Sequence, residues 1–133
     1  MFYKSYKEAH EALGIPGSWQ RGTQGTKEEG ITSIKITSNP RSLDRITGDF
    51  STIYYVGIGE KSSQGEPAAH QLLEDQAPFF TSKQTQNKIP VLIKLESGVV
   101  FYAGLYTVSK IYKRISPRAK RYFEIQFTHA ESP

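Results

Sequence analysis

The sequence contains no cysteine, which excludes disulfide bonds, thiolate zinc sites, iron–sulfur clusters and cysteine nucleophiles. It also lacks any run of about 18 apolar residues, the length that a membrane-spanning helix requires. Met1 is followed by Phe2, Tyr3 and Lys4 rather than by an apolar segment, so no secretory signal peptide is expected. These absences fit a protein of a reducing, cytoplasmic compartment that has no membrane partner.

Hydrophobic residues are scarce as well, at 37% of the chain, but the aromatic share is 12%. Because aromatic side chains each bury a large area, they can build a core where aliphatic residues are few. A chain of 133 residues is long enough for one domain and too short for two. We therefore expect a single domain over residues 1–133.

Two segments carry the signals of short helices. Ser5 can cap a helix over residues 5–13, and a second helix is expected over residues 68–76, where Pro78 would close it. Runs dense in β-branched and aromatic residues predict strands at residues 31–37, 53–59, 91–95, 99–108 and 122–128.

The strands set the expected fold class. Ser97-Gly98 is typical of a tight hairpin turn, and strands joined by short turns are usually antiparallel neighbours. We expect an α+β, mainly β fold in which a curled antiparallel or mixed sheet forms a small barrel with two short helices outside it. Its core would span residues 31–128, with the first helix and a polar loop at residues 17–30 as an extension.

Residues that could perform catalysis are few and scattered. His10, His70 and His129 lie in three different expected elements, and none has the spacing of a metal site. The sequence has no Gly-x-Ser-x-Gly elbow, no phosphate-binding Gly-x-x-x-x-Gly-Lys-Ser/Thr loop and no acidic cluster for two metal ions. We therefore expect no enzyme activity in this chain, no bound metal and no cofactor.

The net charge of +4 is concentrated near one end of the chain. Residues 1–109 hold eleven bases and eleven acids, whereas residues 110–133 hold six bases and two acids. An uninterrupted basic segment interleaved with Tyr112 and Tyr122 contains all six: Lys110, Lys113, Arg114, Arg118, Lys120 and Arg121. Between two strands it would project as a hairpin arm that contacts nucleic-acid phosphates. The alternative is a solvated edge strand, where lysine prevents aggregation.

Three short motifs occur in a characteristic order: Ile53-Tyr-Tyr-Val-Gly-Ile-Gly59, Lys88-Ile-Pro-Val-Leu-Ile-Lys94 and Phe101-Tyr-Ala-Gly-Leu-Tyr-Thr-Val108. In these motifs the chain resembles the SRA (YDG) domain, a PUA-like fold that reads 5-methylcytosine in DNA. Bacterial modification-dependent restriction enzymes carry similar readers fused to HNH-type or other nucleases. The resemblance covers residues from about 31 to 127.

The resemblance implies a pocket for a cytosine that has been rotated out of the duplex. Tyr55 would stack on the base, Val56 would lie beside its 5-substituent, and Asp44 would accept a hydrogen bond from its amine. Gly57 and Gly59 match glycines that let the backbone approach the ring. The following loop would fill the vacated stack, with Lys61, Ser62, Ser63 and Gln64 as its donors.

Two positions depart from the family pattern. Arg41 stands where the family has a second stacking tyrosine, although a guanidinium plane can also stack on a base. Ala103 stands where the family has the aspartate of Tyr-Asp-Gly. An alternative for the tyrosines themselves is a purely structural role in the sheet. Adjacent Tyr54 and Tyr55 must point to opposite faces, so at most one of them can line a given pocket.

The combined interpretation is a DNA-binding module that recognises 5-methylcytosine or 5-hydroxymethylcytosine by base flipping. It would be the specificity domain of a modification-dependent restriction endonuclease, located with the bacterial nucleoid and fused to or associated with an HNH-type nuclease. Its partner would be double-stranded DNA. The alternatives are a PUA/ASCH-like RNA-binding domain, a small nuclease or nucleobase-modifying enzyme, and a protein-interaction module.

Overall fold

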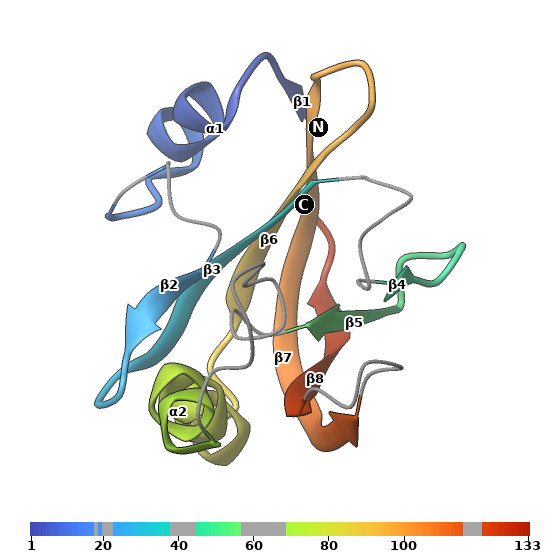
Figure 1. Cartoon of the computed structure of the whole chain (residues 1–133). Coiled ribbons are helices and arrows are strands. Elements are labelled where there is room, and N and C mark those ends of the chain that lie inside the picture. The colour runs from blue at the N-terminus through green and yellow to red at the C-terminus, as the bar shows by residue number, and fades with distance from the viewer. Residues whose placement is uncertain (18, 20–22, 38–44, 57–68, 116–120) are drawn as a thin grey trace.

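The computed structural model describes residues 1–17, 19, 23–37, 45–56, 69–115 and 121–133, and of residues 37, 56, 69–76, 121 and 122 it describes the backbone only. These described residues form eight strands and two helices in the order β1(Phe2–Tyr3), α1(Tyr6–Leu13), β2(Thr23–Thr26), β3(Gly30–Thr37), β4(Arg45–Ile46), β5(Thr52–Val56), α2(Ala69–Thr85), β6(Ile89–Lys94), β7(Val100–Ile115) and β8(Arg121–Glu131). The mainly β prediction is confirmed (Figure 1).

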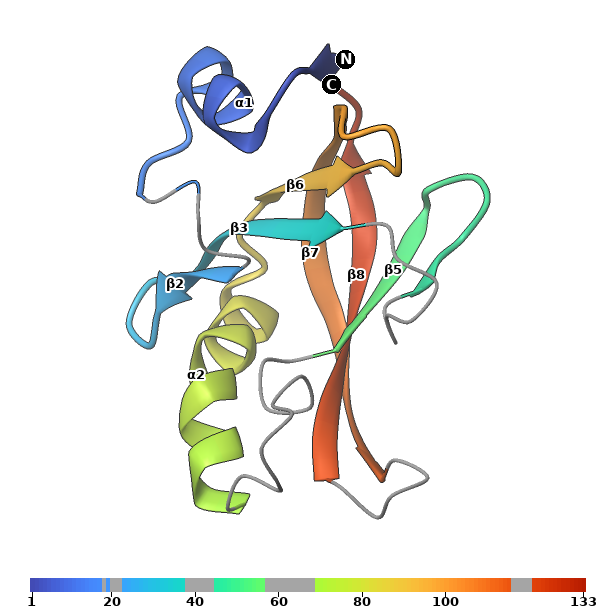
Figure 2. The ribbon, with the colours of Figure 1, turned by 45° about the horizontal axis from the view of Figure 1, so that its top comes forward.

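All eight strands belong to one sheet with the order β2-β3-β6-β7-β8-β5-β4, and β1 pairs with β7. The sheet is mixed: β3 and β6 are parallel, and the other ladders are antiparallel. It curls strongly, as Figure 2 shows, but no ladder in the described part of the chain joins β2 to β4. The expected curled sheet is therefore present, and it is open between its two edge strands.

Helix α1 has the boundaries that its sequence predicts. The Ser5 side chain accepts a hydrogen bond from the Glu8 amide, and Gly14 ends the helix with a φ of 66° in the left-handed region. Its buried face, with Ala9 and His10, covers Leu92 and Val100 on the outer side of the sheet. A second, smaller core lies beneath this helix.

Helix α2 is longer than expected, and the predicted end at Pro78 is wrong: the helix continues to Thr85 with Pro78 inside it. Tertiary packing outweighs the missing proline N–H, because the second half of the helix buries Phe79 and Ser82 against the sheet. The Ser82 hydroxyl accepts a hydrogen bond from the Ile31 amide at 2.7 Å. In the chain, β4, β5 and α2 all lie between the parallel strands β3 and β6, and α2 leads directly into β6.

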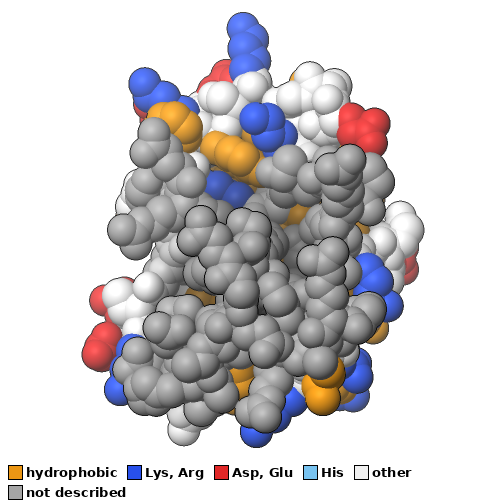
Figure 3. All heavy atoms as spheres, viewed as in Figure 1, with side chains coloured by type: hydrophobic (Ala, Val, Ile, Leu, Met, Phe, Trp, Pro, Cys, Tyr) orange, Lys and Arg blue, Asp and Glu red, His pale blue; other side chains and the backbone are white. Residues whose placement is uncertain are grey.

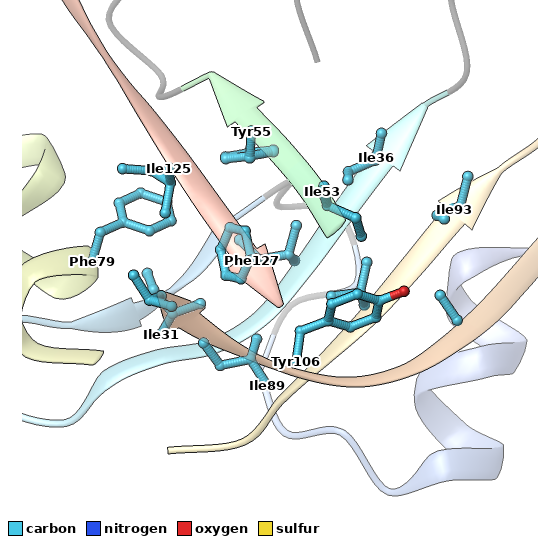
Figure 4. Close-up of a cluster of buried hydrophobic side chains, with 14 of the residues drawn as sticks. Ile31, Ile36, Ile53, Tyr55, Phe79, Ile89, Ile93, Tyr106, Ile125 and Phe127 are labelled. Carbon is cyan, nitrogen blue, oxygen red and sulfur yellow. The ribbon is translucent and has the colours of Figure 1, made fainter. Parts of the chain in front are cut away.

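The main core lies between α2 and the inner face of the curled sheet (Figure 4). Alternation along β5 and β8 turns Ile53, Tyr55, Ile125 and Phe127 inward, and all four are buried. Tyr106 of β7 is fully buried as well, and its hydroxyl donates to the Phe50 carbonyl at 2.6 Å. Aromatic side chains thus supply much of the core, as the composition predicts.

The structure explains why the motif at residues 101–108 has a glycine at position 104. Between Val91 and Leu92 the β6–β7 register shifts by one residue of β7, which makes a bulge at Ala103. Gly104 has a φ of 109°, and a Cβ at this position would collide with the Glu131 carbonyl. The strand bends here because only glycine fits both conditions.

Three short strands, β1, β2 and β4, were not predicted, and β7 and β8 extend beyond their predicted ends. The Ser97-Gly98 turn is confirmed by hydrogen bonds between Leu95 and Val99 and from Gly98 to Leu95. In the part of the chain that the structure describes, no helix is both long and apolar enough to cross a membrane.

Candidate nucleic-acid interface

The β7–β8 hairpin carries the basic segment. Its ladder continues through the pair Ile115 and Arg121, and Figure 2 shows both strands running on past β5 and β6. Lys110, Lys113 and Arg114 are exposed on β7. Lys and Arg side chains are visible beside this end of the hairpin in Figure 3. The segment thus has the hairpin geometry expected of an arm, while its contact with phosphates stays a prediction.

The structure describes only part of the predicted arm. Arg118 and Lys120 lie outside the described residues, and only the backbone of Arg121 is described. The three basic side chains that are described on β7 lie on both faces of the hairpin: Lys110 and Arg114 share one face, and Lys113 lies on the other.

A group of charged and aromatic side chains lies on the outer face of β4, β5, β8 and β7. The Arg45 guanidinium lies 4.4 Å from the ring centre of Tyr54, and that of Arg114 lies 4.5 Å from the ring centre of Tyr112. Both guanidiniums also reach the carboxylate of Glu124, each at 3.3 Å. We call these five residues the outer arginine cluster.

The cluster has an excess of positive charge in a fixed arrangement. Glu124 is 5% exposed and bridges two arginines that remain about half exposed, so among these five residues two positive charges meet one negative charge. Ring faces and a shared carboxylate restrict both guanidiniums, which keeps their outer donors available to an anion. Sequence reasoning missed this cluster because Arg45 and Arg114 are distant in sequence and meet only through the β5–β8–β7 register.

Tyr55, the predicted stacking residue, lies at one end of the main core and is 2% exposed. Its ring centre is 5.9 Å from that of Phe79 and 6.2 Å from that of Phe127 (Figure 4). Its hydroxyl forms a hydrogen bond of 2.6 Å with the Thr23 hydroxyl. A base could stack on this ring only after one of its faces is uncovered, and the stacking role stays a prediction.

The remaining pocket residues cannot be compared with Tyr55. Arg41, Asp44, Gly57, Gly59 and the loop residues Lys61, Ser62, Ser63 and Gln64 lie outside the described residues. Val56 is described by its backbone alone, which pairs with Glu124. The proximity of the Asp44 carboxylate to the Tyr55 ring is therefore still a prediction.

Ala103 has a clear structural environment. It is 5% exposed and belongs to the main hydrophobic core. An aspartate in these surroundings would lose its hydration without gaining a partner, so alanine suits the position in this chain.

The two histidines with described side chains lie in different surroundings. His10 is buried beneath α1, His129 packs edge-on against Tyr106 at 5.2 Å, and the side chain of His70 is not described. Among the described residues, no group of three or more histidines and acids could hold a metal ion.

Comparison with known proteins identifies a family. The sequence model of the SAD/SRA domain matches residues 2–132. A comparison with curated protein sequences finds no match. Structures that resemble the chain include the SUVH5 SRA domain in complex with hemi-methylated CG DNA, with a TM-score of 0.73 and 20% identity over 98% of this chain and 87% of that one.

The same SUVH5 domain bound to fully hydroxymethylated CG DNA has a TM-score of 0.73 and 21% identity over 97% of this chain and 87% of that one. The modification-dependent TagI restriction endonuclease has a TM-score of 0.77 and 21% identity over 99% of this chain. The chain spans 49% of the length of TagI. These likenesses confirm the predicted SRA-like fold.

Proposed function

The chain belongs to the SAD/SRA domain family, and from this premise we propose that it binds double-stranded DNA at a modified cytosine and rotates that base out of the duplex. The family match across residues 2–132 is the observation that carries the proposal. Two similar structures are complexes with hemi-methylated and hydroxymethylated CG DNA, which favours 5-methylcytosine or 5-hydroxymethylcytosine as the base that is read.

Base flipping assigns a role to each predicted pocket residue. Unstacking a base costs a few kcal/mol, which contacts in the pocket must offset. Tyr55 and Arg41 stack on the flipped ring, and Asp44 accepts a hydrogen bond from its amine. Val56, Gly57 and Gly59 leave space for the 5-substituent, and the loop at residues 61–64 enters the vacated stack. Because Tyr55 is buried without DNA, its uncovering accompanies binding.

Phosphate contacts hold the duplex. The exposed bases of β7 and the outer arginine cluster supply cations on the β7–β8 hairpin and beside it. Such contacts add affinity that does not depend on sequence and that weakens as salt increases. The predicted phosphate contacts of Arg118, Lys120 and Arg121 extend this surface to the hairpin end.

The chain acts as a reader and leaves catalysis to another part of a larger assembly. The likeness to the modification-dependent TagI restriction endonuclease supports a role as the specificity domain of such an enzyme. The catalytic partner is an HNH-type nuclease, fused or associated, and the complex works in the bacterial cytoplasm on nucleoid DNA.

The test compares duplexes of one sequence that carry cytosine, 5-methylcytosine or 5-hydroxymethylcytosine at a single position. We expect one modified duplex to bind at least about tenfold more tightly than the unmodified one, measured by fluorescence anisotropy in competition. Equal binding to all three duplexes would exclude base reading. Stronger competition by a structured RNA would favour the RNA-binding alternative.

Asp44→Ala tests the base-reading carboxylate. We expect it to abolish the preference for the modified duplex, since the flipped base loses a hydrogen bond that helps to offset the cost of leaving the stack. Glu96→Ala, at the exposed turn between β6 and β7, removes the same charge elsewhere and should have no effect on the preference. A preserved preference in Asp44→Ala would remove this residue from the pocket.

A further inference from the structure

A side-chain contact between described residues joins the edge strand β2 to β5, the strand next to the other edge. Thr23 lies on β2 and Tyr55 on β5, and four strands separate these elements in the sheet order. No backbone ladder connects them within the described residues, yet their hydroxyl oxygens are 2.6 Å apart. The sheet therefore curls far enough for its inner face to be bridged.

The position of Thr23 follows from strand register. Thr23 pairs with Ile34, which is fully buried on the inner face, so the threonine side chain is directed to the same face. A hydroxyl directed toward an apolar core is stable only with a hydrogen-bond partner. The Tyr55 hydroxyl is such a partner.

The Tyr55 ring is held from three elements. Phe79 of α2 and Phe127 of β8 pack against the ring, with interplanar angles of 42° and 80°, and Thr23 of β2 holds the hydroxyl. The two phenylalanines limit sideways movement of the ring. The hydrogen bond from Thr23 holds the hydroxyl at the far end of the ring.

We propose that Thr23 is a positioning residue for recognition of the modified base: it fixes the Tyr55 ring at the place where the base stacks. This inference rests on the proposed function of Tyr55. A 5-methyl group differs from hydrogen by a contact worth about one methylene, and only a pocket with fixed walls can use so small a difference. The Thr23 contact thus determines discrimination between bases more than affinity for DNA.

Three single variants separate the hydroxyl from the shape of the side chain. Thr23→Val keeps the β-branched shape and removes the hydroxyl, Thr23→Ser keeps the hydroxyl, and Tyr55→Phe removes the other partner. We expect Thr23→Val and Tyr55→Phe each to reduce the preference for the modified duplex about 3- to 10-fold. Thr23→Ser should keep most of the preference.

The double variant Thr23→Val/Tyr55→Phe tests the pair directly. If the two hydroxyls act together, its loss of preference equals that of either single variant, because the interaction can be removed only once. Losses that multiply would show two independent roles and overturn the inference. So would equal losses in Thr23→Val and Thr23→Ser, since a purely structural role is not rescued by the hydroxyl.

Tyr55→Ala separates this inference from the proposed function. If Tyr55→Ala loses the preference while Thr23→Val and Tyr55→Phe keep it, Tyr55 reads the base and the inference about Thr23 fails. If Tyr55→Ala keeps the preference, the stacking role of Tyr55 itself is wrong. Thermal unfolding of each variant confirms that the comparisons are made on folded protein.

Discussion

Lys35 of β3 is 5% exposed, and its ammonium has no hydrogen-bond partner in the part of the chain that the structure describes. Burial lowers the pKa of Lys35 to about 8. His10 of α1 is equally buried, and its pKa is lowered by burial and by the charge of Lys35. Burial disfavours the charged form of both groups, and for Lys35, which is charged in water at pH 7, this opposes the stability of the native state.

Lys35→Met should stabilise the protein by about 1–3 kcal/mol at pH 7, because a buried ammonium is replaced by an apolar chain of similar length. In the wild type, the unfolded state holds the Lys35 proton up to its ordinary pKa of 10.5, whereas the folded state releases it near pH 8. The contribution of Lys35 to the free energy of unfolding therefore rises with pH between about 8 and 10.5.

Urea unfolding at pH 7, 9 and 10 measures both effects. The increase in the free energy of unfolding with pH should be smaller in Lys35→Met than in the wild type. Lys7→Met, at an exposed position of α1, is the control and should change stability by less than about 0.5 kcal/mol. A less stable Lys35→Met at pH 7 would show that the ammonium has a favourable partner.

Gly104 and Gly98 form a matched pair for testing backbone geometry. Both have a positive φ, 109° and 90°, but a Cβ at Gly104 collides with a carbonyl, whereas at Gly98 it meets open space. We expect Gly104→Ala to destabilise the protein by about 2–4 kcal/mol and Gly98→Ala by about 1 kcal/mol. Equal unfolding free energies for the two variants would contradict the steric argument.

At the scale of elements, the sequence predicts strand identity better than strand extent. The alternation that separates buried Tyr55 from partly buried Tyr54 is correct, as are the cap at Ser5 and the turn at Gly98. The two-residue strand β4 has too little pattern to detect. Arg45 of β4 joins the outer arginine cluster through the pairing of β4 with β5 and of β5 with β8, which the local sequence does not show.

Helix α2 shows how packing overrides a local stop signal. Pro78 leaves the carbonyl of residue 74 without its helical donor, yet Phe79 and Ser82 secure the following turns on the sheet. Thr81 adds a hydrogen bond of 2.6 Å to the Lys27 carbonyl. These contacts connect residues far apart in sequence, which a local reading of residues 68–76 cannot include.

Pro78→Ala should therefore raise the free energy of unfolding by about 1–3 kcal/mol, since it restores a helical donor and removes a steric conflict. Urea unfolding monitored by circular dichroism measures the change. Ala77→Gly at the neighbouring position is a control that should destabilise the same helix by about 1 kcal/mol. A loss of stability in Pro78→Ala would show that α2 needs a bend at this residue to pack on β3 and β7.

At the scale of the whole molecule, the excess positive charge is confined to one part of the chain. The body is electrically balanced, and the excess bases lie on one hairpin whose inner half is part of the core. The sequence predicts this division, because an acid-free run between two strands is visible without knowledge of the topology. The parallel pairing of β3 with β6 and the contact between β2 and β5 depend on strand order, which composition and periodicity do not determine.

Arg118→Ala/Arg121→Ala should weaken binding of modified and unmodified duplexes to the same extent and lower the slope of log K against log salt by about 2, one for each lost phosphate contact. Lys4→Ala/Lys7→Ala removes the same charge near α1 and should leave the slope unchanged. Anisotropy titrations at several salt concentrations give both quantities. A change in the ratio between the two duplexes would indicate that the arm contributes to base reading.

The two ends of the chain continue one another along β7. Glu131 pairs with Leu105, Phe2 pairs with Phe101, and both β8 and β1 run antiparallel to β7. Two residues follow Glu131 and one precedes Phe2, and three residues of β7 lie between the pairing partners Leu105 and Phe101. The gap between β8 and β1 therefore has the length that these three terminal residues can span, and Figure 1 shows both termini near the same part of β7. Joining Pro133 to Met1 and opening the chain at Ser97-Gly98 should thus give a circular permutant that folds with near-native stability, as urea unfolding would measure.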